Sequence, residues 1–175
     1  VRMQQYSEAL QTLQDHASTA SKQATHLQEA ASLLSALPGS KLHALLVGVS
    51  KHKDAKLVQA QGALNDVAAM KRLLINHLGT DEANVDCLNN EDATREAIIA
   101  KFKGLVQRAE DGPALFFFAG NGSLDLEKRP TILSYDARQA RIPNDITLAE
   151  LSAIAGYQPT NLVSVIDAGW APGMK

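Results

Sequence analysis

The chain has 175 residues, of which 45% are hydrophobic and 21% are charged, and its net charge is −2 at pH 7. These values are ordinary for one globular domain with an appendage, and the nearly balanced charge argues against a nucleic-acid groove or a basic membrane patch. No apolar run approaches the roughly 20 residues of a membrane span, and no signal peptide is visible.

Histidine and cysteine usage limits the chemistry further. The five histidines do not cluster with acidic residues or with cysteine, so we expect no metal site, and no motif indicates a cofactor. The single cysteine, Cys87, excludes an internal disulfide, which favours a cytoplasmic location. Cys87 itself is expected to be a small buried hydrophobic residue in a strand.

The first 38 residues differ from the rest of the chain. Their apolar positions follow steps of four and three residues without a break: Tyr6, Leu10, Leu13, Ala17, Ala20, Ala24, Leu27, Ala31 and Leu34. This heptad pattern predicts a long helix that ends at Pro38 and Gly39. The helix can fold into a hairpin near residues 18–22 and pack within the chain, or it can form an oligomer as a coiled coil between chains.

Residues 39–175 have the pattern of one α/β domain. Continuous apolar runs predict buried strands, and apolar residues at helical spacing predict helices. In chain order we expect a strand at 42–50, a helix at 63–79, a strand at 84–90, a helix at 92–109, a strand at 113–120, loops with a short hairpin near 131–137, a helix at 147–156 and a strand at 161–169. This alternation predicts a mainly parallel sheet with helices on both faces.

Several helix ends carry local signals. Asp92 or Thr94 can cap the second helix, and Thr147 with Glu150 forms a capping box at the start of the third. Gly79 is a C-terminal stop for the first helix.

The carboxyl ends of the strands are the expected location of a site, because ligands of parallel sheets bind there. Three of these ends read GVSKH (48–52), FAGNGS (118–123) and DAGWAPG (167–173). The second places Asn121 between two glycines directly after a strand, a pattern that predicts an exposed loop holding a functional group.

Seven segments in order resemble the large subunit of the caspase-like cysteine peptidases, especially the metacaspase and bacterial orthocaspase branch. The segments are ALLVGVSKH (44–52), QGALNDVAAMKRLL (61–74), TREAIIAKFKGLV (94–106), ALFFFAGNGS (114–123), ILSYDAR (132–138), ITLAELSAI (146–154) and LVSVIDAGWAPG (162–173). The resemblance covers about residues 42–173 and implies a caspase-like three-layer α/β sandwich.

The resemblance places the catalytic dyad of the family at Asn121 and Gly169. The family has a histidine between the two glycines and a cysteine in the nucleophile loop, whereas this chain has an asparagine and a glycine there. Asparagine cannot act as a general base near neutral pH, and glycine has no side chain that could attack a carbonyl. The chain is therefore expected to be a pseudoprotease, in which Asn121 holds its loop by hydrogen bonds.

The same resemblance implies a pocket for a basic substrate side chain at Asp66 and Asp167. Two carboxylates in a partly buried cleft attract a guanidinium or ammonium group. The family has a cysteine and a serine where this chain has Ala63 and Ala119, so part of the polar lining is lost. The structural alternative is that Asp66 only organises a helix start and Asp167 only ends a strand.

The last predicted strand also implies a partner. The resemblance leads us to expect about two further strands beyond this one, supplied by a small-subunit-like segment of the same gene or by a homologous caspase-like chain. An unpaired apolar edge is an aggregation hazard, so we expect a protein partner to cover it.

The leading functional hypothesis is an inactive caspase-like module that acts as a scaffold or regulatory partner of another protein. One alternative is an active enzyme or a nucleotide-binding domain that uses the AGNGS segment (119–123) as a phosphate-binding turn. A Ser123–His52 pair is a further arrangement of nucleophile and base. A second alternative is a structural assembly protein that works through the helix at residues 1–38.

Overall fold

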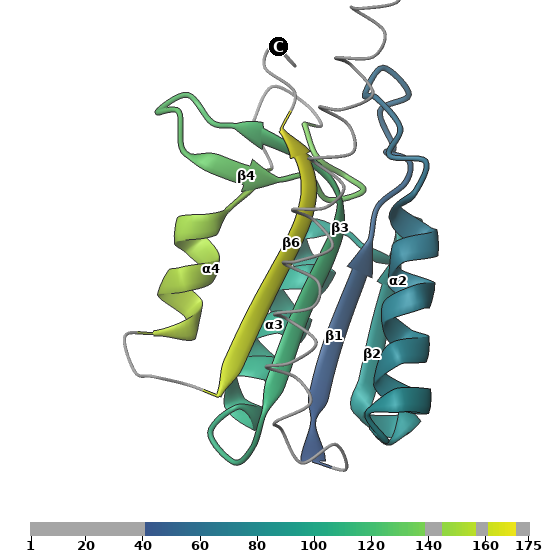
Figure 1. The fold of residues 1–175 in the computed structure, drawn as a ribbon. Coiled ribbons are helices and arrows are strands. Elements are labelled where there is room, and N and C mark those ends of the chain that lie inside the picture. Colours follow the sequence, from purple (N-terminus) through teal and green to yellow (C-terminus); the bar gives the residue numbers. More distant parts are fainter. Residues whose placement is uncertain (1–40, 139–144, 157–160, 171–175) are drawn as a thin grey trace, which may run out of the picture. The chain divides into compact units, whose positions relative to one another are not determined.

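The computed structural model describes residues 41–138, 145–156 and 161–170 (Figure 1). The predicted helix or hairpin at residues 1–38 and the predicted domain boundary after it lie outside these residues. The described elements, in chain order, are β1 (His43–Gly48), α2 (Ala63–Arg72), η2 (Leu73–His77), η3 (Glu82–Asn84), β2 (Val85–Asn89), η4 (Asn90–Asp92), α3 (Arg95–Arg108), β3 (Ala114–Leu124), β4 (Pro130–Ile132), β5 (Ile146–Thr147), α4 (Leu148–Ala155) and β6 (Leu162–Trp170).

The sheet is mainly parallel, as predicted. Strand β1 pairs in parallel with β2 on one side and with β3 on the other, and β3 pairs in parallel with β6. The short strand β4 pairs antiparallel with the last residues of β3, and β5 pairs antiparallel with β4. The four parallel strands therefore lie in the order β2, β1, β3 and β6, with their carboxyl ends at one edge (Figure 1).

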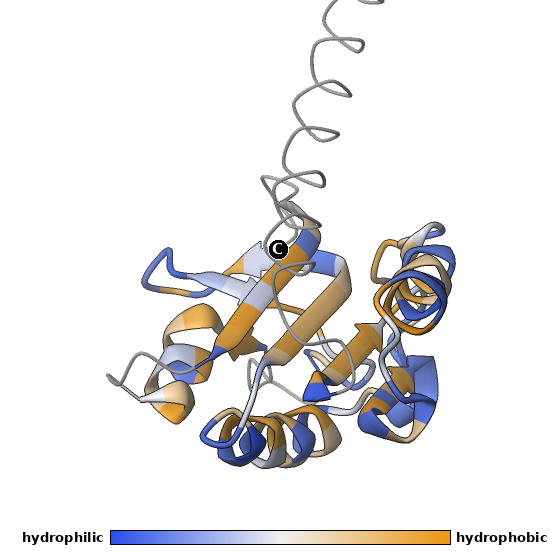
Figure 2. Cartoon of the chain, turned by 60° about the horizontal axis from the view of Figure 1, so that its bottom comes forward, coloured by the Kyte–Doolittle hydropathy of each residue, from blue (hydrophilic) through white to orange (hydrophobic). Residues whose placement is uncertain are grey.

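Helices cover both faces of this sheet, which confirms the three-layer arrangement. On one face, alternate residues of β1 and β3 form a core with α3 and α4, in which the rings of Phe102 and Phe116 meet edge to face with centroids 5.0 Å apart. On the other face α2 packs so closely on Gly48 that an added Cβ would lie 2.9 Å from Val67. Figure 2 shows the hydrophobic residues concentrated on the central strands between the helices.

The helix ends follow the sequence signals with one difference. The side chain of Thr94 accepts a hydrogen bond from the backbone N–H of Ala97 at 3.3 Å, and Thr147 accepts one from Glu150 at 2.9 Å. The carboxylate of Glu150 does not complete a capping box but accepts two hydrogen bonds from Arg95, at 2.7 and 2.8 Å.

Among the described residues, no helix has both the length and the hydrophobicity that a bilayer crossing requires.

The predicted helix at 63–79 is divided in the structure. It is an α-helix to Arg72 and continues as one turn of π-helix over Leu73–His77. Gly79 follows with φ +68°, a left-handed conformation that glycine adopts without steric cost, and so ends the helical segment as predicted.

Strand β3 is longer than predicted, and this corrects the expectation of a loop around Asn121. The strand does not end at Gly120 but continues to Leu124. Pairing explains the extension, because Gly120 and Gly122 lie opposite residues of β6 and Gly122 also lies opposite Ile132 of β4. The glycines of the AGNGS segment are therefore part of an extended ladder, and the predicted phosphate-binding turn at 119–123 is wrong.

Candidate functional site

Asn121 and Gly169 lie directly opposite each other on β3 and β6, at the carboxyl ends of the two strands. Opposite residues of a parallel pair direct their side chains to the same face of the sheet. Among the described residues, apart from its two neighbours in the chain, none has an atom within 4 Å of a Cβ built on Gly169. The structure thus brings together the two positions that the sequence resemblance assigns to a dyad, and leaves open space on the glycine.

The amide of Asn121 is buried and fully engaged as a donor. Asn121 is 8% exposed, and its Nδ2 donates to the backbone carbonyl of Val58 and contacts Nε2 of His52 at 3.3 Å. Both partners belong to the segment between β1 and α2. Asn121 therefore holds a different segment of the chain, and not the turn in which the sequence placed it.

His52 is held as a neutral hydrogen-bond acceptor. Its Nδ1 lies 2.9 Å from the carbonyl oxygen of Ser134, and a carbonyl only accepts, so Nδ1 carries the hydrogen and Nε2 is free to accept from Asn121. Burial of the imidazole lowers the pKa of His52 below its usual value. The sequence indicated only that His52 follows a strand on this side of the sheet, and not that it contacts Asn121.

Ser123 does not form a nucleophile–base pair with His52. Its hydroxyl accepts a hydrogen bond from Nη2 of Arg138 and lies 3.5 Å from the carbonyl oxygen of Leu124. Arg138 also donates to Asp145, at 3.3 Å. Ser123 thus belongs to a polar network under the β3–β4 hairpin, which no sequence motif indicated.

Cys87 lies away from Asn121 and Gly169. It lies in the edge strand β2, so β1 and β3 separate it from Gly169 on β6. The expectation that Cys87 is buried is wrong, because the residue is exposed. Although the residue as a whole is exposed, desolvation by the neighbouring groups raises the pKa of the Cys87 thiol, which disfavours the reactive thiolate.

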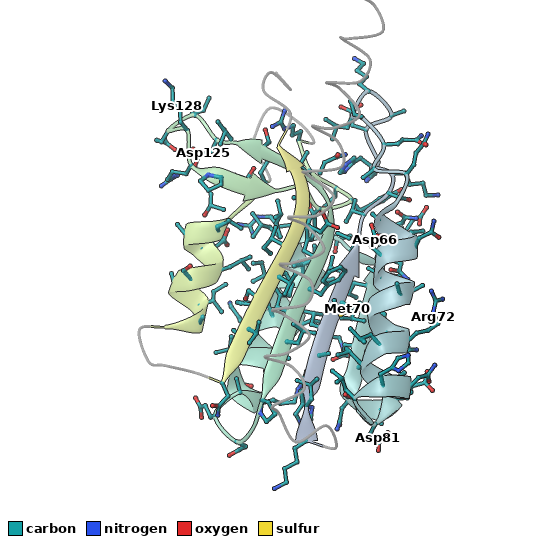
Figure 3. All side chains as sticks on the ribbon, viewed as in Figure 1. Asp66, Met70, Arg72, Asp81, Asp125 and Lys128 are labelled. Carbon is teal, nitrogen blue, oxygen red and sulfur yellow. The ribbon has the colours of Figure 1, made fainter. Side chains whose placement is uncertain are left out.

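Asp66 and Asp167 line one cavity of about 150 Å³ beside Gly169. The rest of the lining comes from the segment before α2, the start of α2 and the end of β3: Ala60, Gln61, Gly62, Ala63 and Gly120. Figure 3 shows Asp66 on α2 close to the carboxyl end of β1. Asp66 and Asp167 are both solvent-exposed residues, so the cavity opens to solvent.

The cavity is negatively charged. Although Asp167 as a whole residue is exposed, neighbouring atoms displace part of the water around its carboxyl. This desolvation and, second, the charge of Asp66 raise the pKa of the Asp167 carboxyl above its usual value. Two carboxylates that repel each other are relieved by a cation between them. Within the described ranges no group of three or more His, Cys, Asp or Glu side chains is arranged to hold a metal ion.

A mainly parallel sheet between two helical layers, with a cavity at the carboxyl ends of the neighbouring strands β3 and β6, is the arrangement expected of a caspase-like α/β domain. The family model described as "Metacaspase, peptidase C14 domain" matches residues 42–169. The chain therefore belongs to the metacaspase family of peptidase C14 domains.

A solved structure agrees with this fold. The crystal structure of protein GSU0716 from Geobacter sulfurreducens is similar with a TM-score of 0.52 and 15% sequence identity, over 74% of this chain. The chain spans 50% of the length of that protein. No curated protein matches the sequence significantly.

Proposed function

We propose that this chain is a catalytically inactive metacaspase-like module that acts as a scaffold or regulatory interaction partner. The observation that carries the proposal is the pairing of Asn121 with Gly169 at the two dyad positions. A neutral amide has no nitrogen that takes up a proton near neutral pH, and a glycine offers neither a thiol nor a hydroxyl. Neither half of the two-residue chemistry is then available at this site.

The described side chains around this pair support the proposal because none of those side chains supplies a nucleophile next to a base. Ser123 is bonded to Arg138, and the hydrogen-bonded imidazole of His52 faces the amide of Asn121 rather than a hydroxyl or a thiol. Cys87 lies at the opposite edge of the parallel strands. A peptidase reaction would need a nucleophile within hydrogen-bonding reach of its base.

In this proposal the acidic cavity binds a basic side chain of a partner protein. Asp66 and Asp167 supply two carboxylates to one opening. Because both are exposed, an ion pair with each is worth only about 0–1 kcal/mol. The cavity then contributes selectivity for arginine or lysine within a larger interface, and not tight binding by itself.

The partner in this proposal also covers strand β6. Within the described part of the chain β6 pairs only with β3. Its other edge presents unpaired backbone groups, which favour addition of a strand. We assign this edge to a small-subunit-like segment or a homologous caspase-like chain in a cytoplasmic setting, with residues 1–38 as a further means of assembly.

Calorimetric titration tests the recognition of a basic side chain. The 175-residue chain is titrated with N-acetyl-arginine methylamide and, as a neutral probe of similar length, with N-acetyl-norleucine methylamide. We expect weak binding of the arginine probe only, and its loss in the Asp66→Asn, Asp167→Asn double variant. The control is the variant Asp81→Asn. Asp81 follows the helical segment that begins with α2, and it lies at the opposite end of that segment from Asp66 (Figure 3). If the double variant bound the arginine probe as tightly as the wild type, the proposal that this cavity binds a basic side chain would be wrong.

A further inference from the structure

Residues 50–62 form a closed loop within the segment that joins β1 to α2. The backbone N–H of Ala60 donates to the carbonyl of Ser50 at 3.0 Å, which joins the two ends of the loop. Inside it, the N–H of Leu57 donates to the carbonyl of Asp54 at 3.1 Å. The last residues of the loop, 60–62, form one wall of the cavity that contains Asp66 and Asp167.

Two anchors hold the first residues of this loop. The side chain of Asn90 accepts from the backbone N–H of Ser50 at 3.0 Å. On the other side, Nδ1 of His52 donates to Ser134 at 2.9 Å, and the N–H of Lys53 donates to the carbonyl of Tyr135 at 2.8 Å. These contacts fix residues 50–53 but do not reach the part of the loop near Val58.

Asn121 provides the contact from β3 to both parts of the loop. Its Nδ2 interacts with the carbonyl of Val58 and with Nε2 of His52. A primary amide carries two hydrogens on one nitrogen, so it can serve both acceptors at once, whereas a neutral imidazole has only one N–H. At the position where the family has a histidine, Asn121 can therefore offer one hydrogen to each of the two acceptors.

We propose that Asn121 is a positioning residue that latches the loop of residues 50–62 onto β3 and so fixes the wall of the acidic cavity. The consequence of this latch, a preformed site for a basic side chain, rests on the proposed function. Holding a binding wall in its bound position lowers the entropy that is lost on binding. The residue at the position of a general base has then become a structural element of recognition.

Hydrogen exchange measured by NMR on the full chain tests the latch. The reporters are the amides of Leu57 and Ala60, which donate to carbonyls within the loop, and of Lys53, which donates to Tyr135 outside it. The variant Asn121→Ala removes both donors. The control Asn161→Ala removes an asparagine amide that also donates to a backbone carbonyl, that of Ala109, at the opposite end of β6.

We expect Leu57 and Ala60 to exchange about fivefold faster in Asn121→Ala, which is the change that corresponds to about 1 kcal/mol, the typical contribution of one hydrogen bond. Lys53, which Tyr135 also holds, should change less, and all three amides should be unchanged in Asn161→Ala. The ¹⁵N resonance of His52 Nε2 should also shift in Asn121→Ala. The arginine probe should bind more weakly to this variant. Unchanged exchange of all three amides in Asn121→Ala would overturn the latch.

The test remains decisive if the variant does not fold or if the arginine probe does not bind. Should Asn121→Ala not fold, the wild-type tautomer of His52 decides, because the latch requires a hydrogen on Nδ1 and none on Nε2. Finding the hydrogen on Nε2 would overturn the inference. Should the wild-type chain not bind the arginine probe, the proposed recognition fails, while the exchange rates still judge the latch by themselves.

Discussion

Asn121 and Gly169 are opposite partners in the parallel pairing of β3 with β6. Neighbouring strands lie about 4.8 Å apart, so a side chain on residue 169 would project beside the amide of Asn121. The space for that side chain is open. This site has the geometry in which two facing groups can cooperate, but it carries an amide and a bare Cα.

The mutual repulsion of the two cavity carboxylates can be tested by removing one charge. In Asp66→Asn the pKa of Asp167 should decrease, because the charge of Asp66 is one of the two causes that raise it. The part of the elevation that comes from burial should remain. Carboxyl ¹³C titration by NMR measures the pKa, and Asp81→Asn serves as the control. An unchanged Asp167 pKa in Asp66→Asn would show that the two side chains do not share one cavity.

The neutral state of His52 predicts an acid-sensitive fold. Burial lowers the folded-state pKa of His52 below its unfolded value of 6.5. The unfolded chain therefore binds more protons as the pH falls below about 6.5, and the free energy of unfolding should decrease from there toward the folded-state pKa. His43 adds a loss of the same sign, since burial and the charge of Arg108 lower its pKa as well.

Urea unfolding at a series of pH values between 7.5 and 5 would measure this loss. The variant His52→Gln should show a smaller decrease between these limits, with the contribution of His43 remaining. The exposed residue His77 provides the control variant His77→Gln, in which the decrease should equal that of the wild type. A decrease in His52→Gln that matches the wild type would contradict the assignment of His52.

The contact between Phe102 and Phe116 should dominate the packing of α3 on the sheet. Phe102 is 1% exposed, so Phe102→Ala leaves a cavity and should reduce the free energy of unfolding by about 3–5 kcal/mol. The matched control is Leu126→Ala, at a residue that is 86% exposed, with an expected change within about 0.5 kcal/mol. Similar losses in both variants would contradict the described core.

Much of the fold could be predicted from local sequence patterns. Buried strands are continuous apolar runs, and the capping threonines at 94 and 147 mark helix starts, because these signals depend on residues close together in the chain. The juxtaposition of Asn121 with Gly169 was expected from the family resemblance and not from the residues alone. The comparison with the family model then confirmed the family.

The details of the site depend on contacts that local patterns do not encode. A Gly-Asn-Gly sequence is typical of a turn, and only the pairing with β4 and β6 keeps it extended in β3. His52 and Asn121 are 69 positions apart, so no spacing rule links them. The same holds for residues 60–62, which line the cavity because the loop is closed by the bond between Ser50 and Ala60.

Peptidase assays on the full chain test the central claim most directly. Fluorogenic peptides that end in arginine or lysine are incubated with the purified wild-type protein, with and without calcium, beside an Asn121→Ala variant and a Gly169→Ala variant. We predict that the wild type releases no more fluorophore than either variant or buffer alone. Turnover by the wild type that a single one of these substitutions abolishes would contradict the claim that the framework binds without cleaving.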